Sequence, residues 1–207
     1  MPDHDAVAQL ELLNKNVGLL IQRSPGNASF VQSFSFSNGD SLWRFTLNSG
    51  FNIKDEKVSG EKCYLLTDSV LYVIGNKGDA ISNTRFSRDF KPVNLILRDS
   101  IIFIVGEKQI GAWKLSANNS ISFLWEKHTG NLYGLSLARE NVVWFLGDND
   151  SLMVVNIRTG EIVHSIRVPY NEIKGNTVYD EIGTRGNYLF LKSRSELGIL
   201  KIDSLIE

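Results

Sequence analysis

The residue types that most often do chemistry are few in this chain and lie far apart. The three histidines are His4, His128 and His164, and no two of them have the short spacing of paired metal ligands. Cys63 is the only cysteine, which excludes an internal disulfide and a zinc site built from cysteines. In "EKCYLLTDSV" it is expected to pack as a small apolar side chain in a strand. The sequence therefore predicts no catalytic residue, no cofactor-binding residue and no metal ligand.

Two short stretches contain the glycines or carboxylates of ligand-binding loops, but neither completes its motif. "GNKGDA" at 75–80 lacks the Lys-Ser or Lys-Thr of a phosphate-binding loop and is expected to be a hairpin turn. "GDNDS" at 147–151 brings Asp148 near Asp150 without the further carboxylates of a calcium loop, which favours a polar hairpin tip. Carboxylates that face each other across a pocket cannot be found from spacing, so a sugar-cleaving enzyme stays open as an alternative.

Composition indicates an ordinary globular protein. The chain has 207 residues, of which 43% are hydrophobic and 22% charged, and its formal net charge is −1. Such a balance shows no electrostatic footprint for nucleic acid or for an anionic membrane surface. No apolar run reaches the ~18 residues that a membrane-spanning helix needs. The first residues, "MPDHDAVAQLELLNKN", also lack the basic start and apolar core of a signal peptide.

Short apolar bursts recur along the chain and determine its predicted architecture. They cover residues 17–22, 70–75, 101–106, 142–147 and 188–193, and their starts are 53, 31, 41 and 46 residues apart. Each burst precedes a second apolar strand, and three copies add an amphipathic third strand: "SLWRFTL", "SFLWEK" and "EIVHSI". A weaker strand, such as "VNLIL" or "YGLSL", comes before most bursts.

Four short strands per ~43 residues is the spacing of β-propeller blades. The sequence therefore predicts an all-β propeller of four-stranded antiparallel blades with about five repeats; a β-sandwich is the alternative. Buried bursts are expected in the middle of each blade and amphipathic strands at the rim, where His164 would lie. His128 is expected in a turn between repeats. The tryptophans are expected to pack between blades: Trp43, Trp113, Trp125 and Trp144.

Two segments are predicted from this pattern. Residues 1–16 form an N-terminal segment that is either a short helix or an edge strand, and residues 17–207 form a single propeller domain or arc. The last repeat has no rim strand of its own. Either "AQLELL" (8–13) supplies that strand and closes a five-bladed ring, or the chain is an arc of a larger propeller. An arc leaves strand edges exposed, which favours self-association.

The repeated unit resembles a known class of propeller. An apolar burst, a strand, a "TG" or "NG" turn and a Trp-containing strand recur in "NGDSLWRF" and "NNSISFLWEK", while "TGEIVHSI" lacks the Trp. This order is similar to the repeat of PQQ-like, quinoprotein-type propellers, and more distantly to other repeat propellers of the WD40 kind. The quinoprotein enzymes use a disulfide between adjacent cysteines, which a single Cys cannot form. The resemblance therefore implies the fold and no quinone cofactor.

A narrower resemblance covers the N-terminal half. "GLLIQ", "VQSFSFSNGDSLWRF" and "KQIGAWKL" are similar to the first repeats of the large luminal subunit, subunit 1, of the endoplasmic-reticulum membrane protein complex. That family is much longer and has a leader and a membrane anchor. The resemblance implies a location in the endoplasmic-reticulum lumen, other subunits of a membrane-associated complex as partners, and a part in transmembrane-helix insertion and membrane-protein maturation. Three sequons fit a luminal history: Asn27, Asn118 and Asn149.

The expected function is therefore that of a non-catalytic protein-interaction scaffold. Two alternatives remain: a small bacterial propeller that acts as an immunity or adaptor protein, and an enzyme that binds a ligand in the central channel. A ligand-binding propeller should place convergent polar groups on its innermost strands, whereas "VNLIL" and "YGLSL" are mostly apolar. If the resemblance extends only to the fold, the expected location is the cytoplasm.

Overall fold

The computed structural model describes residues 7–23, 28–48, 50–130, 132–139, 142–147, 151–167, 181–185, 188–192 and 197–201. These residues form β-strands joined by turns, as the short apolar bursts between polar turns predict. Among them there is no helix long and apolar enough to cross a membrane.

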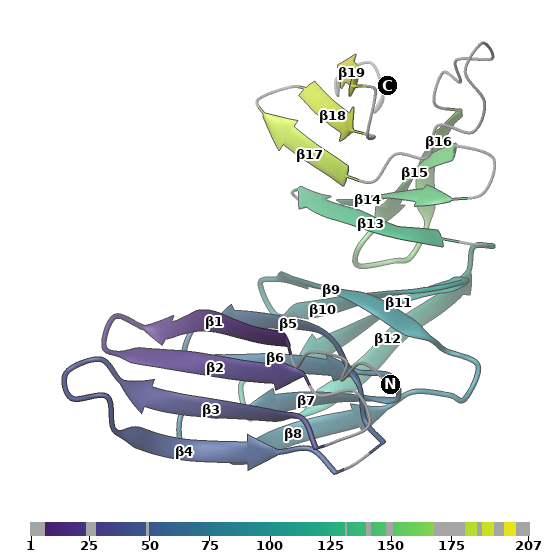
Figure 1. Ribbon diagram of the computed structural model, residues 1–207. Helices are drawn as coiled ribbons and strands as arrows, with labels where there is room; N and C mark the ends of the chain where they lie inside the picture. Colours follow the sequence, from purple (N-terminus) through teal and green to yellow (C-terminus); the bar gives the residue numbers. More distant parts are fainter. Residues whose placement is uncertain are drawn as a thin grey trace, which may run out of the picture. The chain divides into compact units, whose positions relative to one another are not determined.

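The strands form five antiparallel sheets in chain order (Figure 1). The first sheet contains β1 (Val7–Asn14), β2 (Val17–Arg23), β3 (Phe30–Ser35) and β4 (Ser41–Thr46). The second contains β5 (Ile53–Ser59), β6 (Lys62–Thr67), β7 (Val70–Ile74) and β8 (Ala80–Arg85). The third contains β9 (Pro92–Arg98), β10 (Ile101–Gly106), β11 (Gln109–Leu115) and β12 (Ile121–His128). The fourth contains β13 (Leu132–Arg139), β14 (Val142–Gly147), β15 (Ser151–Asn156) and β16 (Ile162–Arg167). The fifth contains β17 (Glu181–Arg185), β18 (Tyr188–Lys192) and β19 (Leu197–Lys201).

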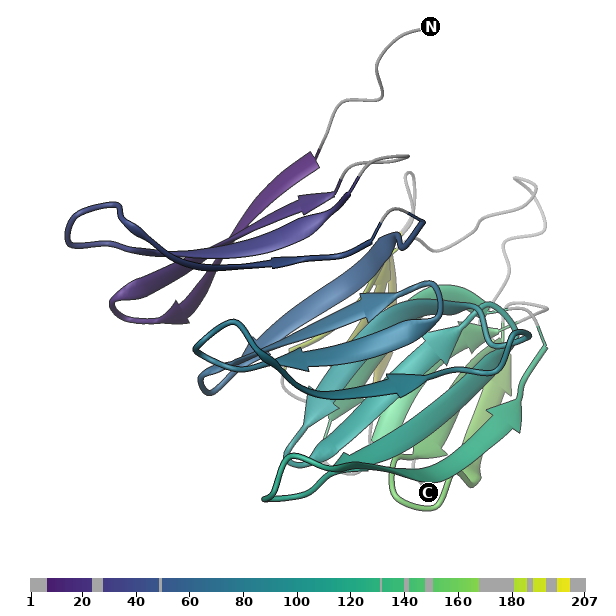
Figure 2. The same cartoon turned by 90° about the horizontal axis from the view of Figure 1, so that it is seen from below.

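Each sheet is a meander in which consecutive strands are neighbours, as in the first sheet from purple to blue (Figure 2). The all-β prediction with four-stranded antiparallel repeats is confirmed.

The chain divides into two compact units: residues up to Leu97 together with Ser116–Ile121, and Arg98–Leu115 together with the residues from Ser122 onward.

The repeat is more regular than the sequence pattern predicts. The second strands of the five sheets begin at residues 17, 62, 101, 142 and 188, which are 45, 39, 41 and 46 residues apart. The burst at Val70 was expected to be equivalent to those at 17 and 101, but it is β7, the third strand of its sheet. The pattern misplaced it because β6 and β7 are both buried on their two faces, so hydrophobicity alone does not distinguish them. The following "DAISNTRF", expected as a middle strand, contains the rim strand β8.

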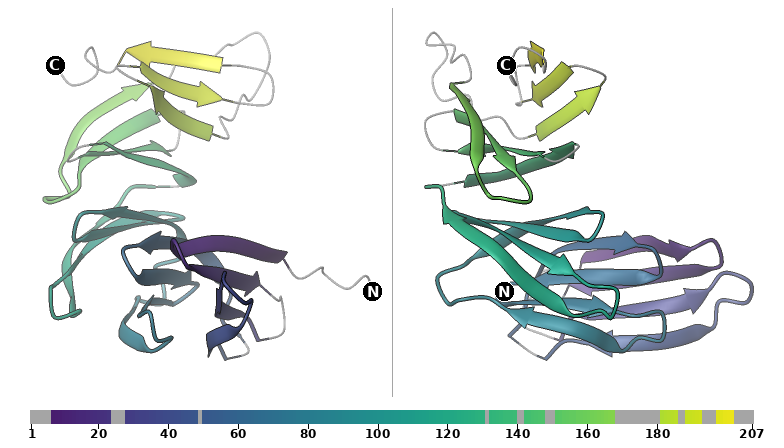
Figure 3. Two further views of the ribbon diagram at one scale, coloured as in Figure 1. Left: turned by 90° about the vertical axis from the view of Figure 1, so that its left-hand side faces the viewer. Right: turned by 180° about the vertical axis from the view of Figure 1, so that it is seen from behind.

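The N-terminal residues adopt the strand of the two predicted alternatives. β1 pairs with β2 along its length, with Leu10 opposite Leu20 and Glu11 opposite Leu19. "AQLELL" is therefore part of the first strand of the first sheet, and of the two alternatives the one in which it supplies the rim strand of the last sheet does not agree with this pairing. The fifth sheet contains three strands in the part of the chain that the structure describes (yellow in Figure 3).

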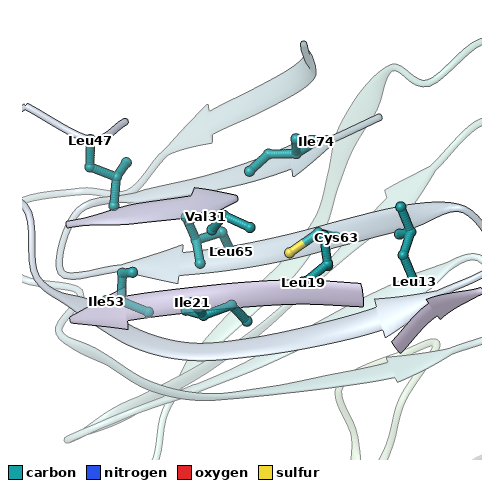
Figure 4. Close-up of a cluster of buried hydrophobic side chains, with 9 residues drawn as sticks. All are labelled: Leu13, Leu19, Ile21, Val31, Leu47, Ile53, Cys63, Leu65 and Ile74. Atoms are coloured by element: carbon teal, nitrogen blue, oxygen red, sulfur yellow. The ribbon is translucent and has the colours of Figure 1, made fainter. Parts of the chain in front are cut away.

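The core of the first unit lies between the first two sheets (Figure 4). Side chains from β2 and β3 pack against side chains from β6 and β7, and all are buried: Leu19, Ile21, Val31, Cys63, Leu65 and Ile74. Each fully buried aliphatic side chain of this size contributes ~1.5–3 kcal/mol relative to exposure. The other predicted central strands agree where side chains are described, since every residue of β10 is buried.

Candidate functional site

A hollow lies along β1 and β5, the first strands of the first two sheets. Its volume is about 530 Å³. Residues of β1, β5 and the end of β2 line it: Gln9, Leu10, Glu11, Leu12, Arg23, Asp55, Glu56, Lys57 and Val58. Five of these side chains are charged, so this groove is where convergent polar groups would meet a ligand or join the two sheets.

A chain of hydrogen bonds crosses the groove from the first sheet to the second. Gln9 donates from Nε2 to Glu11 Oε1 at 2.8 Å, and Arg23 donates from Nη1 to Gln9 Oε1 at 3.1 Å. The other guanidinium nitrogen of Arg23 forms an ion pair with Glu56. Glu56 is only 5% exposed, and a buried carboxylate needs such a partner because burial removes its hydration.

Asp55 connects the second sheet to the first strand of the third. Its Oδ2 accepts a hydrogen bond from the backbone N–H of Leu95 in β9 at 2.7 Å. Its Oδ1 accepts from the Lys57 ammonium at 3.0 Å and from the Glu56 backbone N–H at 2.9 Å. Both carboxylate oxygens of Asp55 are thus occupied by groups of this chain, and the polar side chains of the groove bond mainly to one another and to backbone.

Sequence reasoning missed this network because it judged the innermost strands by "VNLIL" and "YGLSL". Those segments do lie in first strands, β9 and β13. The signal was present in β1 and β5, where charged or amide side chains alternate in "QLE" and cluster in "KDEK". The first strands were expected to be mostly apolar, and in the first two sheets they are instead rich in polar side chains.

Two tryptophans join neighbouring sheets in the same way. Trp43 in β4 donates from Nε1 to the carbonyl of Asn76 at 2.8 Å, and its ring lies against Gly78. Trp125 in β12 donates to the carbonyl of Ile157 at 3.2 Å, and its ring lies against Gly160. The predicted packing of Trp43 and Trp125 between sheets is confirmed. Trp113 is buried in β11, and the side chain of Trp144 in β14 lies outside the described side chains.

The turns that receive these rings share a backbone conformation. Residues Gly39, Gly78, Asn119 and Gly160 each have a φ between +66° and +81° and close the hairpin between the third and fourth strand of a sheet. The predicted hairpin at "GNKGDA" is confirmed, since Gly78 donates a backbone hydrogen bond to Gly75. At Gly78 and Gly160 a Cβ would lie 2.7 and 2.6 Å from the tryptophan ring, so glycine also provides the space.

The predicted chemistry-bearing residues do not come together. Cys63 is fully buried in β6, and burial, with smaller contributions from Glu56 and Glu11, raises the pKa of its thiol to about 12. His164 lies on the rim strand β16 as expected, while His128 ends β12 instead of lying in a turn, and its ring is 2.8 Å from Gln109 Nε2. No group of three potential metal ligands occurs among the described residues. His4, Asp148 and Asp150 lie outside them.

One of the three predicted glycosylation sequons lies within the described residues. Asn118 is exposed in the turn between β11 and β12, and its Oδ1 accepts a hydrogen bond from the Ser120 hydroxyl at 2.8 Å. Asn27 and Asn149 fall outside the described residues.

Solved structures show the fold that these sheets define. BamB from Moraxella catarrhalis matches with a TM-score of 0.68 and 16% identity, covering 98% of this chain and 62% of that one. The WD40 domain of Pan2 from Neurospora crassa matches with a TM-score of 0.66 and 10% identity, covering 100% of this chain and 66% of that one. No protein-family model and no curated protein matches.

The fold is therefore a β-propeller of the kind seen in BamB and in WD40 domains. The chain spans less than two thirds of the length of each of these two structures. At 10–16% identity the likeness defines the fold alone, and the narrower resemblance to the luminal subunit of the membrane protein complex stays a proposal.

Proposed function

We propose that this propeller is a non-catalytic scaffold that binds other proteins. The observation that carries the proposal is the bonding of the inner groove. Arg23 pairs with Glu56 between the first two sheets, and Asp55 accepts hydrogen bonds from the backbone N–H groups of Glu56 and Leu95. These side chains therefore hold sheets together instead of presenting open groups to a substrate. A rigid propeller needs no catalytic groups to offer loops and rims to a partner.

Exposed apolar side chains on the rim strands provide a surface for such contacts. Phe123 and Leu124 on β12, and Ile162 and Val163 on β16, are large and open to solvent. Adjacent residues such as Phe123 and Leu124 point to opposite faces of a strand, so β12 exposes apolar side chains on both of its faces. Exposed apolar side chains of this kind favour contact with a protein.

The resemblance to the large luminal subunit of the endoplasmic-reticulum membrane protein complex supports a more specific proposal. The partners would be other subunits of a membrane-associated complex, the location the endoplasmic-reticulum lumen, and the process the insertion and maturation of membrane proteins. The exposed position of Asn118 suits this proposal, because a glycan attached there would extend into solvent. An immunity or adaptor role in bacteria would use the same rim chemistry.

A ligand-binding role for the inner groove is the second candidate, and the ~530 Å³ hollow is the observation that favours it. In that case Glu11 and Lys57, two charged residues of its lining, would be the contact groups, and the Lys57 side chain is 46% exposed.

Affinity purification of the tagged chain from its native source tests the scaffold. Co-purifying proteins should be recovered in fixed ratio with the wild-type chain and be lost with Phe123→Ser/Leu124→Ser or with Ile162→Ser/Val163→Ser. Glu126→Gln, an exposed change on the same strand as Phe123, should retain them. If both rim variants recover the same proteins as the wild type, the proposed surface is wrong. Loss of binding in Lys57→Ala alone would instead favour the groove.

A further inference from the structure

The first sheet has one covered face and one uncovered face. Side chains directly opposite each other on paired strands lie on the same face, so the register defines both. Leu19, Ile21 and Val31 lie on the face that packs against the second sheet and are fully buried. The other face, here called the Leu10 face, contains Ala8, Leu10, Leu12, Leu20, Gln32 and Phe34. Leu10 is 69% and Leu12 65% exposed.

The Leu10 face is built like an interface between sheets. Phe34 and Phe36 pack edge to face with ring centres 5.4 Å apart, and both rings lie over Gly18, whose missing side chain leaves room for them. Arg44 lies 3.6 Å above the Phe30 ring at the rim of this face. The centre of the face is therefore apolar and aromatic, while its single cation is already held by an aromatic ring.

Register within the chain identifies what such a face binds. β2 and β6 are the second strands of their sheets, so Leu20 of the first sheet corresponds to Leu65 of the second. Leu10 is opposite Leu20 and Glu56 is opposite Leu65, so Leu10 corresponds to Glu56. In the second sheet these positions are buried, because the first sheet covers them. The Leu10 face is thus equivalent to the face of the second sheet that packs against the first sheet, which precedes it in the chain.

Among the described residues of the fifth sheet, one face has exposed apolar side chains. Leu189 in β18 is fully buried, while its neighbours Tyr188 and Phe190 lie on the opposite face with Ile199, which is opposite Phe190. On this face, called the Ile199 face, Leu197 is 60% and Ile199 56% exposed. By the same register, Phe190 corresponds to Leu19, which in the first sheet packs against the next sheet.

We propose that the Leu10 face of one chain docks on the Ile199 face of a second copy of this chain. The Leu10 face is equivalent to the face with which the second sheet contacts the first. The Ile199 face is equivalent to the face with which the first sheet contacts the second, and both faces are apolar at the centre. Pairing unlike faces is a head-to-tail contact, so it extends the row of sheets from one copy to the next. This inference depends on the fold and not on the proposed function.

Light scattering after size-exclusion chromatography tests the contact on the full chain. The average mass should rise with concentration above the 23.2 kDa of one chain. Leu10→Glu/Leu12→Glu and Leu197→Glu/Ile199→Glu should each be monomeric, because each loses one of the two faces. An equimolar mixture of the two variants should form a one-to-one dimer, because each retains the face that the other lacks. Lys127→Glu, an exposed change on β12, should associate like the wild type.

A wild-type chain that stays monomeric at all concentrations overturns the proposal. So does a mixture that stays monomeric, or a Leu10 variant that associates normally. Disulfide trapping provides a second measurement, which detects the contact by a covalent bond and does not depend on variants that disrupt it. Leu12→Cys mixed with Ile199→Cys should form a covalent dimer under mild oxidation, while Lys127→Cys on β12 mixed with Ile199→Cys should not. The native Cys63 stays out of this reaction because it is fully buried.

Discussion

The indole of Trp43 in the first sheet donates a hydrogen bond to the backbone carbonyl of Asn76 in the second, at 2.8 Å. Its ring simultaneously lies against Gly78 in the same hairpin. A side chain on a rim strand thus fixes the turn of the neighbouring sheet, and Trp125 repeats the arrangement with Ile157 and Gly160. The contact supplies both packing area and one satisfied indole N–H.

Replacing Trp43 separates these two contributions. Trp43→Phe keeps most of the ring contact and loses the hydrogen bond, so the free energy of unfolding should fall by about 0.5–1.5 kcal/mol. Trp43→Ala should cost about 2–3 kcal/mol, below the ~3–5 kcal/mol of a fully buried tryptophan because Trp43 is half-buried. Urea denaturation followed by circular dichroism measures both. Equal losses in the two variants would show that the ring contact contributes nothing.

Gly78→Ala should destabilise the chain more than Gly39→Ala. Both glycines have a φ near +80°, so the backbone cost of a Cβ, ~1–2 kcal/mol, is shared. At Gly78 the Cβ would also lie 2.7 Å from the Trp43 ring, whereas nothing lies within 4 Å at Gly39. The excess should be about 1–3 kcal/mol, as for overpacked sites. It should become smaller when both changes are made in a Trp43→Ala background, which removes the ring but keeps the Cβ of residue 43 at 2.8 Å; an excess of the same size there would contradict the contact.

Arg23 should matter more than an exposed arginine does. Arg23→Met leaves the carboxylate of Glu56 buried without its cation, which should lower the free energy of unfolding by about 2–4 kcal/mol. Arg23→Met/Glu56→Leu should recover most of that loss, because the buried charge is then gone. Chemical denaturation of both variants provides the comparison. A double variant no more stable than Arg23→Met would mean that the ion pair does not join the sheets.

Cys63 should make stability depend on pH above 9. Its pKa rises from 9.0 in the unfolded chain to about 12 in the folded one, so the folded chain keeps a proton that the unfolded chain releases between these values. The thiol therefore has no effect below pH 9, and it lowers stability as the pH rises from 9 towards 12. The slope is about 1.4 kcal/mol per pH unit.

Cys63→Ala removes this slope, and the difference between the two chains isolates it from other titrating groups. Denaturation curves at pH 8 and at pH 10 measure the effect. Wild type and variant that lose the same free energy between these two pH values would show that the Cys63 thiol is not buried in the folded chain.

Local pattern was enough to predict the fold class. Apolar runs such as "IIFIVG", buried throughout in β10, alternate with polar turns, and this period implies stacked sheets of short strands. It was not enough to fix the register in the second sheet. Two consecutive strands there are both apolar and largely buried, "KCYLLT" and "VLYVI". Only the pairing between strands shows which of them is the second strand of the sheet.

The inner groove was harder to predict because it depends on residues far apart in sequence. Arg23 and Glu56 are 33 positions apart, and Asp55 and Leu95 are 40 apart. Nothing in the neighbourhood of Glu56 indicates that a cation from another sheet covers it. By contrast, the glycines of the hairpins were predictable, since Gly78 follows a polar turn between two apolar strands and has the backbone conformation that such turns favour.

Native mass spectrometry of the chain purified from its source tests the scaffold account most directly. The account predicts the 23.2 kDa chain in complexes with other proteins and with no small molecule or metal retained on it. A stoichiometric small molecule that stays bound to the wild-type chain, and is lost in Lys57→Ala or Glu11→Gln, would contradict the account and identify the groove along β1 and β5 as a ligand site.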